Sequence, residues 1–253
     1  MIMKSRFNPF KSAAILSFLA AILVVLVGCK SPQVRPGTDN YQEGPAPNEI
    51  LSAAALQPVS EVEGKGWHPI FDGSLTGWRV TEFGGGGRVE IKQGLMFFKM
   101  GGPFTGVNFT NVIPNQNYEV TLEAMRVEGD DFFCGLTFPI GDSCSSLILG
   151  GWGGSTAGIS SIDGHDASAN ETSQEMSFET GHWYRIRLRV SEQKLEAWVG
   201  QKKIVEVVRA GHKFSMYASE IEQSKPFGLA SWATSAAFRD IRIRDIPGLA
   251  DHP

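Results

Sequence analysis

A period-two alternation of apolar and polar residues is the feature that most constrains the fold of this chain. The alternation runs from Trp67 to Arg244, and short turn segments interrupt it at close intervals. The predicted strands are residues 79–83, 88–92, 95–99, 107–111, 118–127, 131–137, 145–149, 174–178, 183–190, 194–199, 203–209, 227–232 and 237–244. After Trp67 a helical turn is expected only around residues 214–221, and before it residues 50–56 could form one or two helical turns. Because no βαβ alternation separates the strands, the pattern disfavours a parallel-sheet enzyme fold.

The hairpin at residues 183–199 shows how the strands should pack. One face of its first strand is apolar, and the other carries Arg185, Arg187 and Arg189. Aligned across the turn, Arg189 lies opposite Glu196 as an ion pair, and Arg187 lies opposite Trp198 as a cation–π pair. We expect these arginines to form a solvated outer face. One apolar and one polar face predict a sheet packed on a second sheet.

The first residues have the pattern of an export signal. Basic residues precede an apolar run, Ala13 to Val27, which is short for a membrane span and has the length of a signal-peptide core. The run ends in Leu-Val-Gly-Cys, which resembles the lipobox of bacterial lipoproteins. Residues 1–28 are therefore predicted to be a signal peptide and Cys29 to carry a lipid. An ordinary signal peptide or a stub anchor is the alternative.

Composition divides the remaining chain into three parts. Residues 29–66 are rich in proline and polar residues and are predicted to be a disordered tether. Residues 67–247 suit one β-sandwich domain, and residues 248–253 form a tail. The expected location is the bacterial cell envelope, with the membrane-anchored lipoprotein facing the periplasm or the cell surface. A formal net charge of −4 and the lack of a basic cluster argue against nucleic acid as a partner.

Two cysteines, Cys134 and Cys144, flank a predicted hairpin turned at residues 139–142. An exported protein permits a disulfide. However, the expected pairing of the strands places the two sulfur atoms on opposite faces, near or beyond disulfide reach. Both are predicted to be free, buried thiols.

The glycine-rich stretch at residues 150–171 carries most of the candidate site chemistry. Five glycines surround Trp152, and hydroxyl, carboxylate, imidazole and amide side chains follow within 20 residues. A rim that binds a ligand is one interpretation, because function tends to lie on loops held by a rigid scaffold. A long solvated loop across the edge of the sandwich is the other.

Three stretches resemble the 3-keto-disaccharide hydrolase domain family. Residues 71–78 read Phe-Asp-Gly-Ser-Leu-Thr-Gly-Trp, close to the family's opening signature. Residues 181–200 resemble its strand pair that ends in a short turn, and residues 227–243 resemble its closing strands. The resemblance implies an all-β fold, a concanavalin A-like jelly-roll β-sandwich of two antiparallel sheets with a concave face that binds sugar. Some members cleave glycosides whose sugar is oxidised at the 3-position.

The chain departs from the family pattern in the two strands that usually carry polar residues. The Asn and Arg of the first strand are absent from residues 133–138. In the second strand, Gly158 and Ser160 replace a Glu and a Gln, and only Asp163 matches. The missing polar side chains favour a non-catalytic binding module over an enzyme.

The site residues expected from these patterns centre on Asp163, which is either a catalytic base or a turn residue. Trp152 and Trp232 suit stacking against a sugar ring. Further contacts to substrate are expected from His165, Asp166, Asn170 and Glu171. Asp72 and Asp240 resemble a structural Ca²⁺ site of jelly-roll relatives, or else are a turn residue and a strand-end residue.

The leading functional hypothesis is a carbohydrate-active lipoprotein of the cell envelope, a divergent hydrolase or lyase of 3-keto-glycosides. A non-catalytic, lectin-like carbohydrate-binding or interaction module is the alternative, and a purely structural lipoprotein is a third. The expected partners are a carbohydrate or modified glycoside and, through a lipid at Cys29, the membrane.

Overall fold

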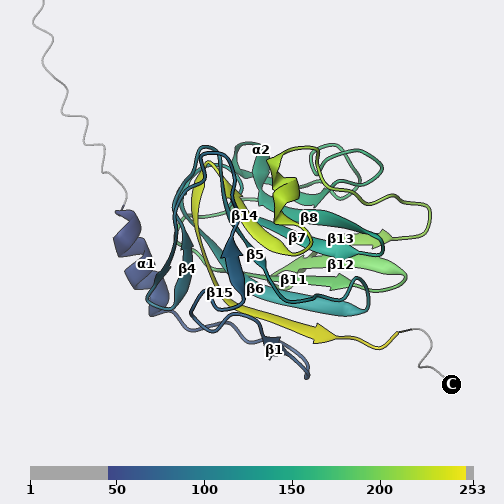
Figure 1. Cartoon of the computed structure of the whole chain (residues 1–253), viewed down its shortest axis with the longest axis horizontal. Coiled ribbons are helices and arrows are strands. Elements are labelled where there is room, and N and C mark those ends of the chain that lie inside the picture. The colour runs from purple at the N-terminus through teal and green to yellow at the C-terminus, as the bar shows by residue number, and fades with distance from the viewer. Residues whose placement is uncertain (1–44, 249–253) are drawn as a thin grey trace, which may run out of the picture. The chain divides into compact units, whose positions relative to one another are not determined.

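The computed structural model describes residues 45–248, which form a sandwich of two antiparallel sheets (Figure 1). Sheet A has the order β13 (Lys202–Val208), β12 (Lys194–Val199), β11 (Tyr184–Val190), β6 (Tyr118–Gly129), β15 (Thr234–Asp245), β4 (Leu95–Phe98) and β3 (Val89–Lys92), with β1 (His68–Pro69) beside β15. Sheet B has the order β10 (Gln174–Glu175), β9 (Thr156–Ser160), β8 (Ser143–Gly150), β7 (Cys134–Ile140), β14 (Gly228–Trp232), β5 (Phe104–Phe109) and β2 (Trp78–Val80). The helical elements are α1 (Pro47–Ala55), α2 (Gly151–Gly154) and the 3₁₀ helix η1 (Glu220–Ser224).

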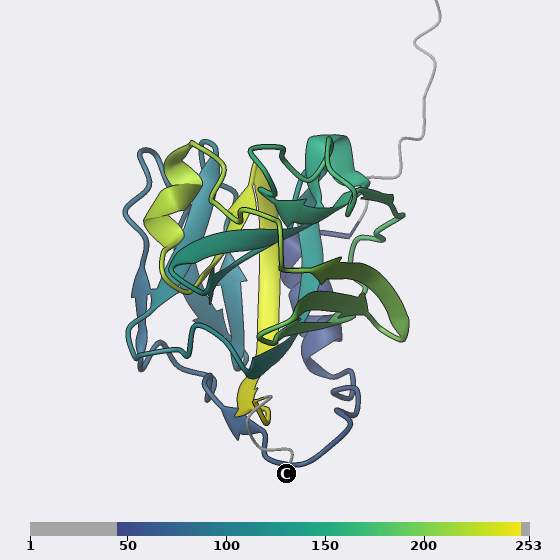
Figure 2. The same cartoon turned by 90° about the vertical axis from the view of Figure 1, so that its right-hand side faces the viewer.

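The main core lies between the two sheets, as the period-two pattern requires. From β6, Tyr118, Val120 and Leu122 point inward and are fully buried, and they belong to one cluster with Leu136 and Leu147 of sheet B. In the turned view of Figure 2, teal and green strands cross in front of β15, drawn in yellow, and α1 lies behind it in purple. The prediction of an all-β sandwich of two antiparallel sheets is confirmed. In the described part of the chain, we find no helix long and apolar enough to cross a membrane.

Most predicted strands are present, and two differ in an instructive way. Strand β7 spans Cys134–Ile140, three residues later than expected, and β9 (Thr156–Ser160) occupies the middle of the stretch interpreted as a loop. In β9, Ala157 and Ile159 face the main core, which gives even this glycine-containing segment a buried face. The stretch at residues 150–171 is therefore a strand of sheet B with a turn before it and a loop after it.

The register of the hairpin at residues 183–199 is confirmed. Arg187 pairs with Trp198 and Arg189 with Glu196, and the Arg187 guanidinium carbon lies 3.9 Å from the Trp198 ring centroid. Arg189 Nη1 lies 3.6 Å from a Glu196 carboxylate oxygen. The prediction of a solvated outer face is wrong for Arg185, whose side chain is only 11 % exposed.

Residues 45–66 cover part of this face of sheet A. They were predicted to belong to a disordered tether, and that prediction is wrong for them. Helix α1 begins with Pro47 in its first turn, which suits proline because an N–H there has no helical partner. Its apolar face, Ile50, Leu51 and Ala54, packs on a patch of sheet A formed by Leu95, Phe97, Met125, Val127, Trp183 and Ala237. The apolar area buried there offsets the entropy of ordering the segment. The predicted signal peptide, Cys29 and the tail from residue 249 lie outside the described residues.

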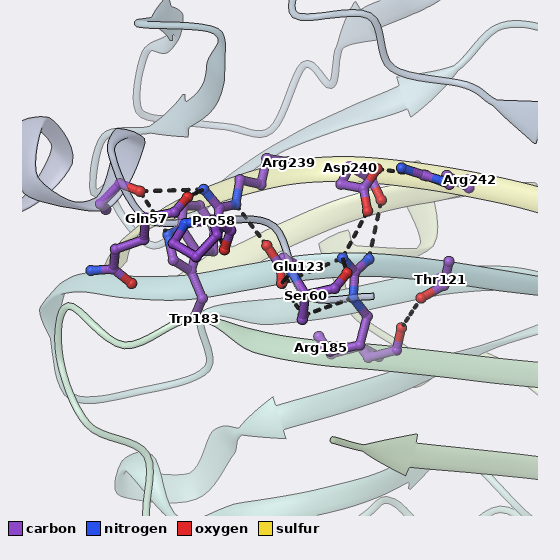
Figure 3. A network of polar contacts seen from close by, with 12 residues as sticks. Gln57, Pro58, Ser60, Thr121, Glu123, Trp183, Arg185, Arg239, Asp240 and Arg242 are labelled. Carbon is purple, nitrogen blue, oxygen red and sulfur yellow. Dashed lines mark hydrogen bonds and ion pairs between the residues drawn. The ribbon is translucent and has the colours of Figure 1, made fainter. Parts of the chain in front are cut away.

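After α1, residues 56–66 run across sheet A as a strap that a buried ionic network holds (Figure 3). Glu123 of β6 is 2 % exposed and accepts hydrogen bonds from the Ser60 backbone N–H at 2.9 Å and from Arg239 Nε at 2.7 Å. Arg239 also donates to the carbonyl oxygens of Gln57 and Pro58, at 2.8 and 3.0 Å. Arg185 joins Glu123, Ser60 and Asp240 on the other side. The polar groups of sheet A's outer face therefore bond one another and the strap.

The two cysteines are free, as predicted, and the β7–β8 hairpin places them on opposite faces. Cys134 pairs with Leu149 and Cys144 with Pro139, a register two residues away from the expected one. Cys134 is fully buried in the core, and burial raises the pKa of its thiol. Cys144 is only half-buried, so the expectation of two buried thiols is correct for one of them.

Candidate functional site: an aromatic pocket on sheet B

The outer face of sheet B is apolar in its centre, whereas that of sheet A combines an apolar patch under α1 with an ionic network. In β14, Leu229 faces the main core while Ala230 and Trp232 point outward. The outward residues belong to a separate cluster made of Phe83, Phe104, Phe132, Ile148, Ala167, Ile221 and Ala230, with Met216 and Trp232 against it. A sheet that is apolar on both faces must be covered on each or must bind something.

A cavity of about 310 Å³ opens in this cluster. Five aromatic side chains surround it, together with Ile148, Ile221, Asp131 and three serines; the aromatic residues are Phe104, Phe132, Trp152, Tyr217 and Trp232. Phe104 and Trp232 meet edge to face, with ring centroids 4.6 Å apart. Trp152 and Tyr217 are 46 % and 49 % exposed, and within residues 45–248 they are the two aromatic members of the set of exposed large hydrophobic side chains. Both belong to the rim of this one cavity.

Trp152 reaches the rim through a strained turn. Its φ is 50° and its ψ is 52°, the left-handed conformation that a bulky L residue rarely adopts. Gly150 is also left-handed, and a Cβ there would lie 2.5 Å from Nη2 of Arg126, so this position requires glycine. Backbone strain of this kind costs on the order of 1–3 kcal/mol and concentrates at functional sites.

Asp131 is the one acidic residue among the described residues that line the cavity. Its Oδ1 accepts the Phe132 backbone N–H at 2.7 Å, and its Oδ2 accepts the Gly153 N–H at 3.3 Å. The carboxylate therefore connects the segment before β7 with the turn that carries Trp152. It lies at the pocket wall as an acceptor that a ligand hydroxyl could also use.

Arg126 of β6 holds the same turn from behind. The residue is 7 % exposed, and its Nη2 donates to the carbonyl oxygens of Asp131 and Gly154, at 3.2 and 3.0 Å. Burial lowers the pKa of this guanidinium, while the acidic groups of Tyr184, Asp131 and Asp130 oppose that shift. Arg126 thus fixes the backbone on both sides of the pocket wall.

Asp163, the predicted base, lies outside the lining of this cavity. It occupies a left-handed turn position with φ 52°, and its two oxygens accept the Lys213 N–H and meet His212 Nδ1, each at 2.7 Å. The hydrogen bond from the Lys213 backbone, followed by the contact with His212, lowers the pKa of Asp163. A carboxylate that lies outside the cavity and has a lowered pKa is poorly placed as a general base for a ligand bound there. The geometry agrees with the alternative interpretation of Asp163, as a turn residue.

The other polar residues of the stretch bond within their loop or to the neighbouring β9 and His212. The Asn170 side-chain amide donates to the carbonyl oxygens of Ile159, His165 and Asp166. Asp166 Oδ1 accepts the Ser168 N–H and hydroxyl, and Glu171 lies 3.8 Å from His212. None of the four predicted contacts, His165, Asp166, Asn170 or Glu171, lines the aromatic cavity. Of the predicted site residues, the structure brings Trp152 and Trp232 together there.

The two aspartates considered for Ca²⁺ are engaged in other bonds. Asp72 Oδ1 accepts the Ser74 N–H and hydroxyl, and hydrogen bonds with Ser74 lower the pKa of Asp72. The two oxygens of Asp240 meet Arg242 at 2.6 Å and Arg185 at 2.7 Å. Within residues 45–248, no three His, Cys, Asp or Glu side chains come together as a metal site. Asp72 thus acts as a turn residue, as in the alternative interpretation, while Asp240 lies within β15 and joins the ionic network of sheet A.

Sequence reasoning missed Phe104, Phe132, Asp131 and Tyr217 as pocket residues. The adjacent acids at 130 and 131 directly before two phenylalanines were a usable signal, since a carboxylate beside aromatic residues is typical of sugar sites. Nothing local, however, places residue 131 beside residues 152, 217 and 232. That proximity depends on β14 lying between β5 and β7, with the Trp232 N–H donating to the Phe132 carbonyl oxygen at 3.0 Å.

The fold and the pocket together define the class of protein: a lectin- or glucanase-like β-sandwich with an aromatic site on one sheet. The profile of the 3-keto-alpha-glucoside-1,2-lyase-like domain family matches residues 66–244, and the chain belongs to this family. The membership supports a carbohydrate-related function. A comparison with curated proteins gave no match.

Two solved structures share the architecture. A protein of unknown function with a galectin-like fold from Bacillus subtilis is 12 % identical, with a TM-score of 0.50 over 71 % of this chain and 94 % of that one. The Crh5 transglycosylase in complex with NAG is 8 % identical, with a TM-score of 0.50 over 73 % of this chain and 85 % of that one. At these identities the likeness concerns the fold alone.

Proposed function

We propose that the pocket on sheet B binds a neutral saccharide, with Trp152 and Trp232 as stacking platforms. The observation that carries this proposal is the convergence of five aromatic side chains on one open cavity, two of them about half exposed. Monomeric proteins rarely expose such side chains together without a partner. A sugar ring suits the site because its C–H face packs on an aromatic ring while its hydroxyls reach polar groups at the edge.

The polar groups around the aromatic rings fit the same ligand. Asp131, Ser146, Ser160 and Ser219 line the cavity, so hydroxyl groups of a sugar meet one carboxylate acceptor and three hydroxyls. A volume of about 310 Å³ lies at the lower end of the range of about 300–1,000 Å³ for small-molecule sites. This size suits one or two sugar rings rather than a long chain held end to end.

The test is a calorimetric titration of the purified full-length protein with methyl α-glucoside, maltose and trehalose. Saturable binding of at least one of them is expected. Trp152→Ala should weaken it about tenfold, which corresponds to about 1.4 kcal/mol. Trp67→Ala is the matched control, because Trp67 lies on the strap side of the molecule and outside this cavity. Saturable binding that Trp152→Ala and Trp232→Ala leave unchanged would contradict the proposed site.

A second candidate function is elimination of the aglycone from a 3-keto-glucoside, which the family membership favours. Asp131 is the acid positioned for it, in place of the Asp163 expected from the sequence. Its carboxylate would take the C2 proton, which the 3-keto group acidifies. The C2–H electrons would form the C1–C2 double bond, and the C1–O bond would break. The aglycone would leave with a proton from water.

This candidate is tested with 3-keto-glucosides and their unoxidised parents, by following aglycone release. Release from the keto compounds alone, lost in Asp131→Asn and kept in Asp163→Asn, would establish the enzyme and its base. Binding of the parent sugars without any release would leave the pocket as a binding module.

We also propose that the protein is a lipoprotein of the bacterial cell envelope, anchored through Cys29. The support is the apolar run that ends in Leu-Val-Gly-Cys. Expression in a bacterial host with labelled fatty acid should label the wild-type protein and leave Cys29→Ser unlabelled. Label retained in Cys29→Ser would place the lipid elsewhere or exclude the anchor.

A further inference from the structure

A second cavity, of about 330 Å³, lies next to the aromatic pocket and has a different chemistry. Its lining includes Arg126, Asp130, Glu175, Ser155 and Ser177. Asp130, Glu175 and Ser177 are exposed, and Arg126 is buried. Where the first cavity is aromatic, this second one carries charged and hydroxyl groups.

The turn α2 forms a wall shared by both cavities. Trp152 lines the aromatic pocket, and the next two residues, Gly153 and Gly154, line the polar cavity. In the same way Asp131 lines the first and Asp130 the second. Two pairs of consecutive residues are thus divided between the cavities, so a ligand that crosses the turn beside Trp152 passes from one to the other.

Arg126 is the unusual group of the polar cavity. Its Nη1 and Nη2 donate to three backbone carbonyl oxygens, of Phe178, Asp131 and Gly154. Its Nε is buried and has no hydrogen-bond partner. Within residues 45–248 no carboxylate lies within ion-pair distance of this guanidinium. A buried donor left unpaired costs about 1–3 kcal/mol, so the wall of this cavity holds a cation whose hydrogen bonds the protein does not all satisfy.

The charges around the cavity narrow the kind of ligand. One arginine and two acids, Asp130 and Glu175, give the lining a net charge of −1, which disfavours an anion. A cationic ligand would lie against the Arg126 guanidinium. A neutral polyhydroxyl group is repelled neither by the two carboxylates nor by the guanidinium. Its hydroxyls donate to a carboxylate and accept from a guanidinium N–H or a serine.

We propose that this cavity is a second, polar sugar subsite, and that the natural ligand is a neutral oligosaccharide or glycoside of at least two units. One unit stacks in the aromatic pocket and the next reaches Asp130 and Glu175 across the turn that carries Trp152. The inference rests on the proposed function of the aromatic pocket and adds the length and polarity of its ligand.

The test compares ligand length in wild type and in two surface variants, Asp130→Asn and Glu175→Gln. Calorimetric titrations use methyl α-glucoside, maltose and maltotriose with the full-length protein. In wild type, maltotriose should bind about tenfold more tightly than methyl α-glucoside, as expected for two or three added hydrogen bonds. Each variant should lose most of this gain and keep the affinity for methyl α-glucoside. Glu82→Gln, an exposed acid outside both cavities, is the control.

The outcomes separate the inference from the proposed function. Equal affinity for the three sugars in wild type, with binding that Trp152→Ala weakens, would overturn the second subsite and keep the aromatic one. A length-dependent gain that persists in both variants would also overturn it. No saturable binding of any of the three sugars would overturn both proposals together.

Discussion

The outer faces of the two sheets differ in their buried charges and in what covers them. Sheet A carries buried carboxylates, Glu119 and Glu123, each bonded to two arginines, and a helix and strap cover part of it. Sheet B carries an aromatic cluster with an open cavity and two half-exposed aromatic side chains. On sheet A the polar groups bond one another, which gives that face a structural role. On sheet B the aromatic cluster is buried except at the cavity, where Trp152 and Tyr217 are about half exposed, and this opening is the proposed ligand site.

The largest expected effect belongs to the buried network of sheet A. Glu123→Ala should lower the free energy of unfolding by about 3–5 kcal/mol, because it leaves Arg239 buried without a carboxylate and takes one of two carboxylates from Arg185. Urea denaturation measures it. If the variant fails to fold, Glu123→Gln, which keeps the shape, gives a smaller loss. A change of less than about 1 kcal/mol in both would show that the network contributes little and would break the contrast between the faces.

The docking of α1 is the next largest effect. Leu51 is 2 % exposed on the apolar face of the helix, and Leu51→Ala should cost about 2–3 kcal/mol if the helix unfolds together with the sandwich. Hydrogen exchange then speeds up throughout the domain. If α1 opens by itself, exchange rises only in residues 47–55 and the global stability stays the same. Ala53→Ser, on the exposed side of the helix, is the control.

Acidification should weaken the same network by a smaller amount. Burial raises the pKa of Glu123, but hydrogen bonds from Ser60, the charge of Arg185 and a hydrogen bond from Arg239 outweigh burial, so the net pKa is lowered. The stabilisation is complete above the unfolded pKa of about 4.3 and is lost as the pH falls through the lower folded value. Melting temperatures of wild type between pH 7 and pH 3 should therefore fall more than those of Glu123→Gln.

The exposed Glu206 is the comparison for this pH dependence. Hydrogen bonds and charges of Lys194 and Lys203 hold its pKa at about 2, yet the carboxylate is solvated. Exposed ion pairs contribute little to stability, so the melting temperatures of Glu206→Gln between pH 7 and pH 3 should closely follow those of wild type. A Glu206→Gln profile that flattens as much as that of Glu123→Gln would contradict the assignment of the acid effect to the buried face.

Local sequence patterns predicted the strands and one hairpin register well, because their causes are local. Alternation defined the faces of β11 and β12, and the tight turn between them fixed Arg187 opposite Trp198. The helix α1 was harder to predict. Pro47 and the spacing of Ile50, Leu51 and Ala54 are visible in the sequence, but the patch that receives them combines β4, β6 and β15. Residues 50–56 allowed one or two helical turns but did not require them, because a helix that short gains its stability from such packing.

The candidate site was predicted only in its aromatic part, for the same reason. Trp152 and Trp232 are recognisable singly, because large exposed aromatic residues among glycines or at strand ends suit sugar stacking. The carboxylate was misplaced, since Asp163 bonds His212 and Lys213 while Asp131 lines the cavity. Choosing between two aspartates needs the order of β5, β14 and β7 in sheet B, which depends on contacts far apart along the chain.

The smallest expected change in stability comes from the face proposed to bind the ligand, and it tests the comparison most sharply. Trp152 holds a left-handed conformation at φ 50°, which glycine adopts without steric cost. Trp152→Gly should therefore leave the free energy of unfolding unchanged or raise it by up to about 1 kcal/mol, while saccharide binding falls at least tenfold. Trp152→Ala removes the ring but keeps the backbone strain. Comparing it with Trp152→Gly therefore separates the effect of losing the ring from the effect of relieving the strain. A Trp152→Gly variant that loses as much stability as Glu123→Ala would show that the aromatic rim is structural. The expected small change would show that the strained residue has no large role in packing, and such retained strain indicates a role in binding.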